Sequence, residues 1–379
     1  MANTLTSLVP DLYEALDVVS RELSGFIPAV TLDASAERAA LNQAIRIPIT
    51  PAAPAEDVAP GQLPPDDGDQ NISNNVLSIT KSRMVPFRWT GEEQKGVNSG
   101  VGYKNIRRDQ IAQAMRTLVN EIEANIGSTF VSASRAWGTA GTTPFATDLS
   151  DPAQIRKILS DNGAALSDLQ MVIDTTAGAK VRSLAQLTKA NEAGTTELRA
   201  QGKLLDIHGF TLRESAGVNS HTKGTGASYV VNNSGGYAAG ATSIALGTGT
   251  GTVLAGDIVT FAGDTNKYVV GTGVAAPGSI AINNPGLRLA LANTTAATVG
   301  NSFTANLAFA RSAIVLATRA PALPEEGDMA EDRMLITDPR TGLTFEVAMY
   351  KQYRRVRYEV SLAYGWSCIK PEHTAILLG

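Results

Sequence analysis

Apolar residues recur every three or four positions along one stretch of this chain, which predicts a long helix from Ile106 to Ala136. A helix of about 30 residues is about 45 Å long, and most helices in globular proteins are much shorter. The apolar stripe consists of Ile111, Met115, Leu118, Ile122, Ile126, Phe130 and Ala133. The residues off this stripe are Gln113, Arg116, Asn120 and Glu123. The pattern therefore predicts a stiff helix that lays one face on a sheet.

A second, shorter apolar stripe lies near the start of the chain and consists of Leu12, Leu16, Val19 and Leu23. Ser7 is suited to cap a helix there, and Gly25 with Pro28 marks its end. We expect a short amphipathic helix whose apolar face another element must cover.

The segment from Pro51 to Asp69 carries five prolines, so it can form neither a helix nor a central strand. A strand with the letters AIRIPIT precedes it, and a second strand returns with Val85, Phe87 and Trp89 on one face. This order predicts an extended two-stranded arm with a long tip. A disordered surface loop is the alternative interpretation.

Helix and strand patterns alternate between residues 150 and 216, which predicts a compact mixed subdomain. The composition changes at about Gly217, and from Thr225 to Gly300 short strand patterns alternate with Gly, Pro and Asn turns. The charged residues in that stretch are only Asp257, Asp264, Lys267 and Arg288. Short strands at near-regular spacing predict a small inserted β-barrel or sandwich.

Strict alternation of apolar residues returns near the end of the chain, at Val356, Tyr358, Val360, Leu362, Tyr364 and Trp366. This period of two is typical of a half-buried strand. A hairpin turn is expected just before it, from Asp338 to Gly342. Together with the helices, these patterns place the chain in the α+β class.

The bulk composition excludes several classes of protein. Hydrophobic residues make up 43% and charged residues only 18%, which suits a chain that buries much surface within itself or against its own copies. The net charge of -4 argues against a basic nucleic-acid-binding protein. A single cysteine, Cys368, excludes an internal disulfide framework. We expect neither a membrane span nor a signal peptide, because neither pattern occurs.

Residues that could carry catalysis are scattered. The histidines His208, His221 and His373 have no metal-ligand spacing, and no known zinc, phosphate-binding or nucleophile motif occurs. The letters GTGVAA at Gly271 match a dinucleotide fingerprint, but Pro277 follows where that fingerprint requires a helix. We therefore expect no enzyme activity, no cofactor and no metal.

Two groups of charged residues are candidates for intermolecular contacts. The basic group consists of Arg83, Arg88, Lys351, Arg354, Arg355 and Arg357. The acidic group consists of Glu56, Asp57, Asp66, Asp67 and Asp69, with no Lys or Arg between them. The basic strand residues could contact DNA phosphates, with neighbouring tyrosines stacking. Because the whole chain is acidic, we favour pairing of the basic strand rim with acidic segments of neighbouring subunits.

The order of these parts resembles a known family. The succession of terminal helix, extended arm, long helix, α/β subdomain and Gly-rich insertion, with the letters GDIVTFAG, FARSAIVLATRAPALP and YGWSCIKPEHTAILL, is similar to the major capsid (coat) proteins of tailed double-stranded-DNA phages. More narrowly it resembles the coat proteins of short-tailed Salmonella-type phages, which carry an inserted I-domain.

The resemblance implies the Hong Kong 97-like capsid fold, which herpesviruses share. It implies an N-arm at 1–40, an E-loop at 41–95, a peripheral domain at 96–149 and 301–379 with spine helix 106–136, an axial domain at 150–216 and an inserted β-barrel at 217–300. The implied function is self-assembly into hexamers and pentamers of an icosahedral shell around DNA. No Lys–Asn crosslink can be assigned, so a non-crosslinked shell is expected.

The same resemblance implies partners: other copies of the chain, a scaffolding protein during assembly, a portal protein at one vertex, a decoration protein and the packaged double-stranded DNA. The implied location is the virion, assembled in the host cytoplasm. Two alternatives remain open. A tail-tube or baseplate protein would also be β-rich, but it does not need the long helix. A β-rich adhesin would explain the insertion, but secretion of an adhesin would require a signal peptide.

Overall fold

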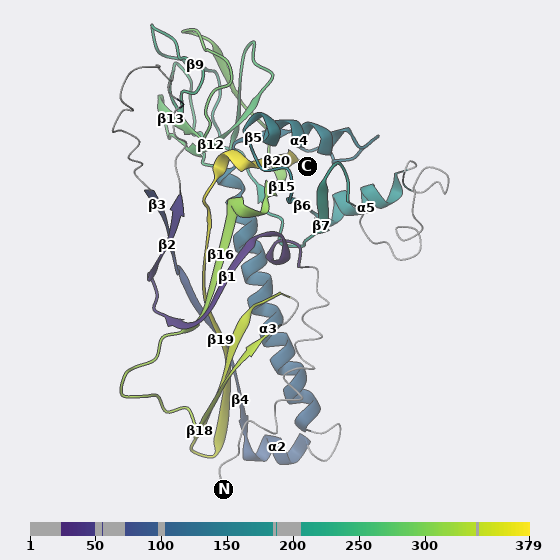
Figure 1. Ribbon diagram of the computed structural model, residues 1–379, viewed down its shortest axis with the longest axis vertical. Helices are drawn as coiled ribbons and strands as arrows, with labels where there is room; N and C mark the ends of the chain where they lie inside the picture. The colour runs from purple at the N-terminus through teal and green to yellow at the C-terminus, as the bar shows by residue number, and fades with distance from the viewer. Residues whose placement is uncertain are drawn as a thin grey trace, which may run out of the picture.

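A computed structural model describes residues 24–49, 55, 73–97, 103–184, 187, 206–338 and 341–379. The molecule is elongated, with one long helix beside long strands and a small barrel at one end (Figure 1). The helices are α2 (Gly91–Val97), α3 (Tyr103–Gly127), α4 (Ser150–Asp161) and α5 (Thr175–Ser183). The strands of the long sheet and of the separate ribbon are β1 (Thr31–Ala39), β2 (Ala44–Ile49), β3 (Ser73–Ser78), β4 (Lys81–Thr90), β16 (Ile314–Pro321), β17 (Asp332–Thr337), β18 (Thr344–Gln352) and β19 (Arg355–Cys368).

A second sheet contains the remaining strands. They are β5 (Arg135–Trp137), β6 (Leu169–Ile173), β7 (Phe210–Glu214), β8 (Ser220–His221), β9 (Tyr229–Val231), β10 (Ser243–Gly247), β11 (Ile258–Phe261), β12 (Lys267–Thr272), β13 (Gly278–Ile282), β14 (Ala296–Val299), β15 (Phe303–Ala310) and β20 (Thr374–Leu378). The C-terminal part of the chain is thus divided between both sheets, because β15 and β20 join the second sheet and β16 to β19 form the long one.

The predicted apolar stripe is confirmed as the buried face of α3 and of the turn that follows it. Every residue of the stripe is at most 6% exposed. These side chains pack in one core with the inward-facing residues of the long sheet, whose order is β1-β16-β19-β18-β17 with β4 paired to β19. The strand predicted from the alternating residues is β19, and it pairs with β4 from Arg355 to Tyr364.

The predicted inserted β-barrel is confirmed. Strands β11, β14, β9, β10, β13 and β12 pair in that order, and β12 pairs back with β11, so the barrel closes. It has a core of its own that includes Tyr229, Phe261 and Tyr268. Strand β12 also pairs with β5, which links the barrel to β20, β15, β6 and β7. Helices α4 and α5 pack beside this part of the sheet (Figure 1).

The prediction that the long helix extends to Ala136 is wrong. Helix α3 begins at Tyr103 and ends at Gly127, where a Cβ atom would lie 2.4 Å from the carbonyl oxygen of Gly217. The chain then continues as a 3-10 turn, Ser128–Ser132. The apolar period runs through this turn, since Phe130 and Ala133 stay buried, so the pattern could not mark the end of the helix.

The predicted arm is also built differently. The strand that pairs with β2 is β3, whereas the strand with Val85, Phe87 and Trp89 is β4 in the long sheet. The pattern missed β3 because its letters, SNNVLS, are mostly polar. The residues that carry the expected tip, Pro51 to Asp69, lie outside the described residues except for Ala55.

The start of the described chain belongs to the subunit core. Phe26, Ile27, Ala29 and Val30 are at most 3% exposed, and β1 pairs in parallel with β16. This described part of the expected N-arm, residues 1–40, is therefore packed against its own subunit. The amphipathic helix expected at Leu12 to Leu23 lies outside the described residues.

Candidate functional site

Five of the six predicted basic residues gather at the end of the long sheet that lies farthest from the barrel (Figure 1). Lys351 ends β18, Arg354 lies in the turn, and Arg355 and Arg357 begin β19. Arg88 of β4 lies directly opposite Arg357. The fold therefore concentrates positive charge at one tip of the long sheet.

The sixth residue, Arg83, lies elsewhere and has a different partner. Its Nε atom and the Nζ atom of Lys81 each lie 3.0 Å from a carboxylate oxygen of Glu121 on α3. The hydrogen bond to Glu121 raises the pKa of Arg83. Arg83 thus joins the long sheet to α3, and its position does not bring it to the tip.

Two of the tip cations are neutralised within the subunit. The Nζ atom of Lys351 donates to Glu331 at 2.6 Å, and Arg357 lies 2.5 Å from Glu359. In the described part of the chain, no carboxylate lies within salt-bridge distance of Arg354 or Arg355. Among the described residues, the tip cations without such a carboxylate are therefore Arg354 and Arg355 at the turn and Arg88 beside it on β4.

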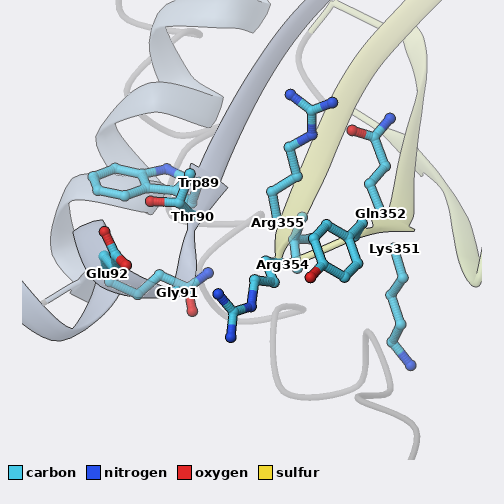
Figure 2. Close-up of a pocket in the computed structure, with 11 residues that line it drawn as sticks. Trp89, Thr90, Gly91, Glu92, Lys351, Gln352, Arg354 and Arg355 are labelled. Atoms are coloured by element: carbon cyan, nitrogen blue, oxygen red, sulfur yellow. The ribbon is translucent and has the colours of Figure 1, made fainter.

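A surface hollow of about 900 Å³ opens at this tip between α2 and the β18–β19 turn. Lys351, Arg354 and Arg355 line it together with the single carboxylate of Glu92, so its lining is net positive. Figure 2 shows the three cationic side chains pointing away from one another rather than toward one centre. Such a spread suits an extended partner better than a small anion.

The predicted acidic partners cannot be placed in the same way. Glu56, Asp57, Asp66, Asp67 and Asp69 lie outside the described residues. Their pairing with the basic tip stays a prediction.

The sequence pattern missed a buried carboxylate on α3. Glu123 was expected off the buried face, and this is wrong, because it is only 3% exposed. Its carboxylate accepts from the backbone N–H groups of Gly25 (3.1 Å), Phe26 (2.9 Å) and Ile27 (2.8 Å), and from the Ser215 hydroxyl (2.6 Å). Burial raises the pKa of Glu123, while the four donors act in the opposite direction. Glu123 thus fixes the entry of the N-terminal segment into the subunit.

A second buried carboxylate fixes the base of the barrel. Asp257 accepts from the backbone N–H groups of Gly224 (3.1 Å) and Leu254 (2.7 Å) and lies 2.8 Å from Nε2 of His221. The ring of His221 packs on Phe130, with 5.5 Å between the ring centroids. Asp257 therefore ties the strand that enters the insertion to the turn after α3.

Arg135 joins three parts of the subunit from β5. Its guanidinium donates to Asn266 of the barrel at 2.8 Å, and to Asn162 (3.0 Å) and the carbonyl oxygen of Ile158 (3.2 Å) at the end of α4. Burial lowers the pKa of Arg135. The barrel is therefore held by side chains as well as by the β12–β5 pairing.

The described residues contain no group of three or more His, Cys, Asp or Glu placed to hold a metal ion. His208 lies at a turn with φ 52°, His221 binds Asp257, and burial lowers the pKa of His373. In the same part of the chain, no helix has the length and apolar character of a membrane span.

No known family profile and no curated protein matches the chain, but solved structures do. A protein in the capsid structure of the cyanophage P-SCSP1u matches with a TM-score of 0.51 and 12% identity, over 94% of this chain and 88% of that chain. A protein of Mycobacterium phage Che8 gives a TM-score of 0.48, 13% identity and coverage of 89% and 84%. A protein of the bacteriophage PhiM1 mature capsid matches with a TM-score of 0.47 and 10% identity, over 94% of this chain and 86% of that chain. The cyanophage match confirms the predicted α+β phage capsid fold.

Proposed function

We propose that this chain is a major capsid protein whose copies assemble into hexamers and pentamers of an icosahedral shell around a double-stranded DNA phage genome. The observation that carries the proposal is the likeness in fold to the cyanophage capsid structure, which extends over 94% of this chain. Because one fold can serve several functions, the proposal also draws on the contact surfaces of this particular chain.

Each part of the subunit has a place in this proposal. Helix α3 is the spine of the peripheral domain, together with the long sheet. The ribbon β2–β3 is the base of an E-loop, α4 and α5 with β6 and β7 form the axial domain, and residues 1–40 form the N-arm. The closed barrel between β8 and β15 supports the narrower resemblance to coat proteins with an I-domain.

The contacts between copies involve the residues singled out from the sequence. The acidic group, Glu56 to Asp69, supplies carboxylates, and Arg88, Lys351, Arg354, Arg355 and Arg357 supply cations. Arg83 contributes less to these contacts between copies, because Glu121 of the same subunit already binds it. A shell repeats each contact many times, so individually weak pairs give a stable particle through multivalency.

The proposed role is structural rather than enzymatic, and the partners follow from it. They are other copies of the chain, a scaffolding protein during assembly, a portal protein at one vertex, a decoration protein and the enclosed DNA. Assembly takes place in the host cytoplasm, and the product is the virion. A net charge of -4 suits a shell that encloses DNA without binding it tightly.

Sedimentation of the chain produced together with its scaffolding partner tests the proposal. We expect the full chain to sediment as large particles. A matched variant that lacks residues 51–69 should remain as folded subunits, because that segment has too few apolar residues to support the core. A full chain that stays monomeric at high concentration with scaffold present would overturn the proposal. Normal particles from the deletion variant would instead overturn the role given to the arm.

A further inference from the structure

A hollow of about 320 Å³ opens where the barrel, the short strand β5 and the start of α4 meet (Figure 1). Its walls come from Lys267 of β12, Trp137 of β5, Leu378 of β20 and the loop 138–149 that leads into α4. Ligand pockets form preferentially where domains meet, and their usual volume begins at about 300 Å³. The hollow therefore has the position and the size of a small-molecule site.

Trp137 presents a fixed aromatic ring to this hollow and is 37% exposed. Its strand, β5, pairs with β12 on one side and with β20 on the other, which holds the backbone in place. The indole N–H donates to Asp151 at 3.3 Å and so sets the orientation of the ring. A rigid ring of this kind offers apolar contact area at a low cost in conformational entropy.

The loop 138–149 is held in a strained conformation beside the ring. Phe145 has φ 58°, which is a rare value for a bulky residue. Its side chain is fully buried, and its backbone N–H donates at 2.9 Å to the same Asp151 carboxylate. Strained residues persist where the surrounding structure determines them, and they cluster at ligand sites. One carboxylate thus fixes both the loop and the ring of Trp137.

Free hydroxyl groups make up much of the polar lining. Thr139, Thr142, Thr143 and Thr147 line the hollow, and among the described residues none makes a hydrogen bond to their hydroxyls. A hydroxyl group both donates and accepts. The lining therefore suits a ligand that itself carries many neutral hydroxyls.

The charged groups of the lining argue against an ionic ligand. Both oxygens of Asp151 accept from the N–H groups described above, and Asp148 accepts from the N–H of Ser150 at 2.9 Å. Lys267 donates to the carbonyl oxygen of Gly138. Two carboxylates against one ammonium group disfavour phosphates and other anions, and the ammonium group in the same lining disfavours an organic cation.

Two further hollows adjoin this one and lengthen the site. One of about 460 Å³ shares Thr142, Thr143 and Ala146 with it and continues to α5. The other, of about 80 Å³, shares Trp137 and Lys267 and continues along α4. The ligand that fits such a track is a chain of several units rather than a single small molecule.

We propose that these hollows bind a neutral oligosaccharide. A sugar ring has an apolar face of C–H groups, which stacks on Trp137, and a rim of hydroxyls, which pair with the four threonines. This activity goes beyond the proposed shell-forming role and does not depend on it, because all the walls of the site lie within one subunit.

The test titrates full-length, unassembled subunits with maltohexaose, cellohexaose, mannohexaose and chitohexaose, read by saturation-transfer NMR. We expect at least one of them to bind with a Kd of about 1 mM. Trp137→Ala should weaken that binding about tenfold or more. Tyr353→Ala, which removes an exposed aromatic ring at the far tip of the long sheet, should bind as the wild type does.

Thr142→Val is the second variant, because it removes one hydroxyl and keeps the volume of the side chain. Thr142 is exposed, so the melting temperature should stay within about 1 °C of the wild type. Binding should weaken about threefold to tenfold. This variant decides the inference if Trp137→Ala does not fold.

Each outcome decides the inference. No saturable binding of any of the four sugars up to about 20 mM overturns it, whether or not shells form. Sugar binding that neither variant weakens places the sugar elsewhere and overturns it as well. Binding of choline that depends on Trp137, without sugar binding, would assign the hollow to cations and overturn the inference. Trp137-dependent sugar binding by a chain that forms no shell supports the inference and overturns the proposed function.

Discussion

Replacing Glu123 with alanine should destabilise the subunit by about 3 kcal/mol. The change leaves the N–H groups of Gly25, Phe26 and Ile27 and the hydroxyl of Ser215 without their acceptor in a buried site. Four orphaned donors at about 1 kcal/mol each amount to about 4 kcal/mol, and removal of the desolvated carboxylate returns part of that. Denaturant unfolding of purified subunits measures the difference.

The matched control lies two residues away on the same helix. Glu121 binds Lys81 and Arg83 at a half-exposed position, so Glu121→Ala should cost no more than about 1 kcal/mol. An effect of Glu123→Ala within about 0.5 kcal/mol of the wild type would refute the view that this carboxylate holds the N-terminal segment in place.

The pH dependence gives a second check on Glu123, with Glu123→Gln as the non-titrating reference. Burial raises the pKa of Glu123 in the folded subunit above its unfolded value of about 4.3. The stability linked to this group is therefore fully present below about pH 4.3 and is lost as the pH rises through the raised folded pKa. The advantage of the wild type over Glu123→Gln should narrow as the pH rises from about 4. An advantage that widens with rising pH would show that the four hydrogen bonds outweigh burial.

Two further predictions concern the spine and the barrel. Ile122→Asp places a carboxylate on the buried stripe of α3 and should destabilise the subunit by about 3–5 kcal/mol. Its control, Gln113→Asp on the exposed face of the same helix, should change stability by about 0.5 kcal/mol or less. Equal losses of soluble yield for the two variants would contradict the orientation of the helix. Residues 227–300 should fold alone, because the barrel closes on itself and has its own core, and a poorly dispersed amide spectrum of that fragment would disprove this.

The parts that sequence predicted best are those whose pattern is local. The stripe on α3 and the strand β19 follow periods of 3.6 and 2, which depend only on neighbouring residues. The barrel was predictable because its turns recur at near-regular spacing. These local features are sufficient to predict the α+β class.

The parts that sequence missed depend on distant segments. Glu123 looks solvent-exposed in the helical pattern, but two distant segments bury it: the N-terminal segment, 96 to 98 residues away, and Ser215, 92 residues away. The end of α3 is set by the close approach of Gly217, which no local signal marks. The grouping of Arg88 with Arg355 and Arg357 needs the pairing of β4 with β19, strands that lie far apart in the chain. In each case the decisive partner comes from tertiary structure.

Electron microscopy of particles formed by the full chain, produced together with its scaffolding partner, tests the central proposal most directly. The account predicts closed icosahedral shells in which the subunits form rings of six and rings of five, with α3 visible as a rod along each subunit. Open tubes would instead favour a tail-tube protein, and dispersed single subunits at high concentration would contradict a shell-forming role.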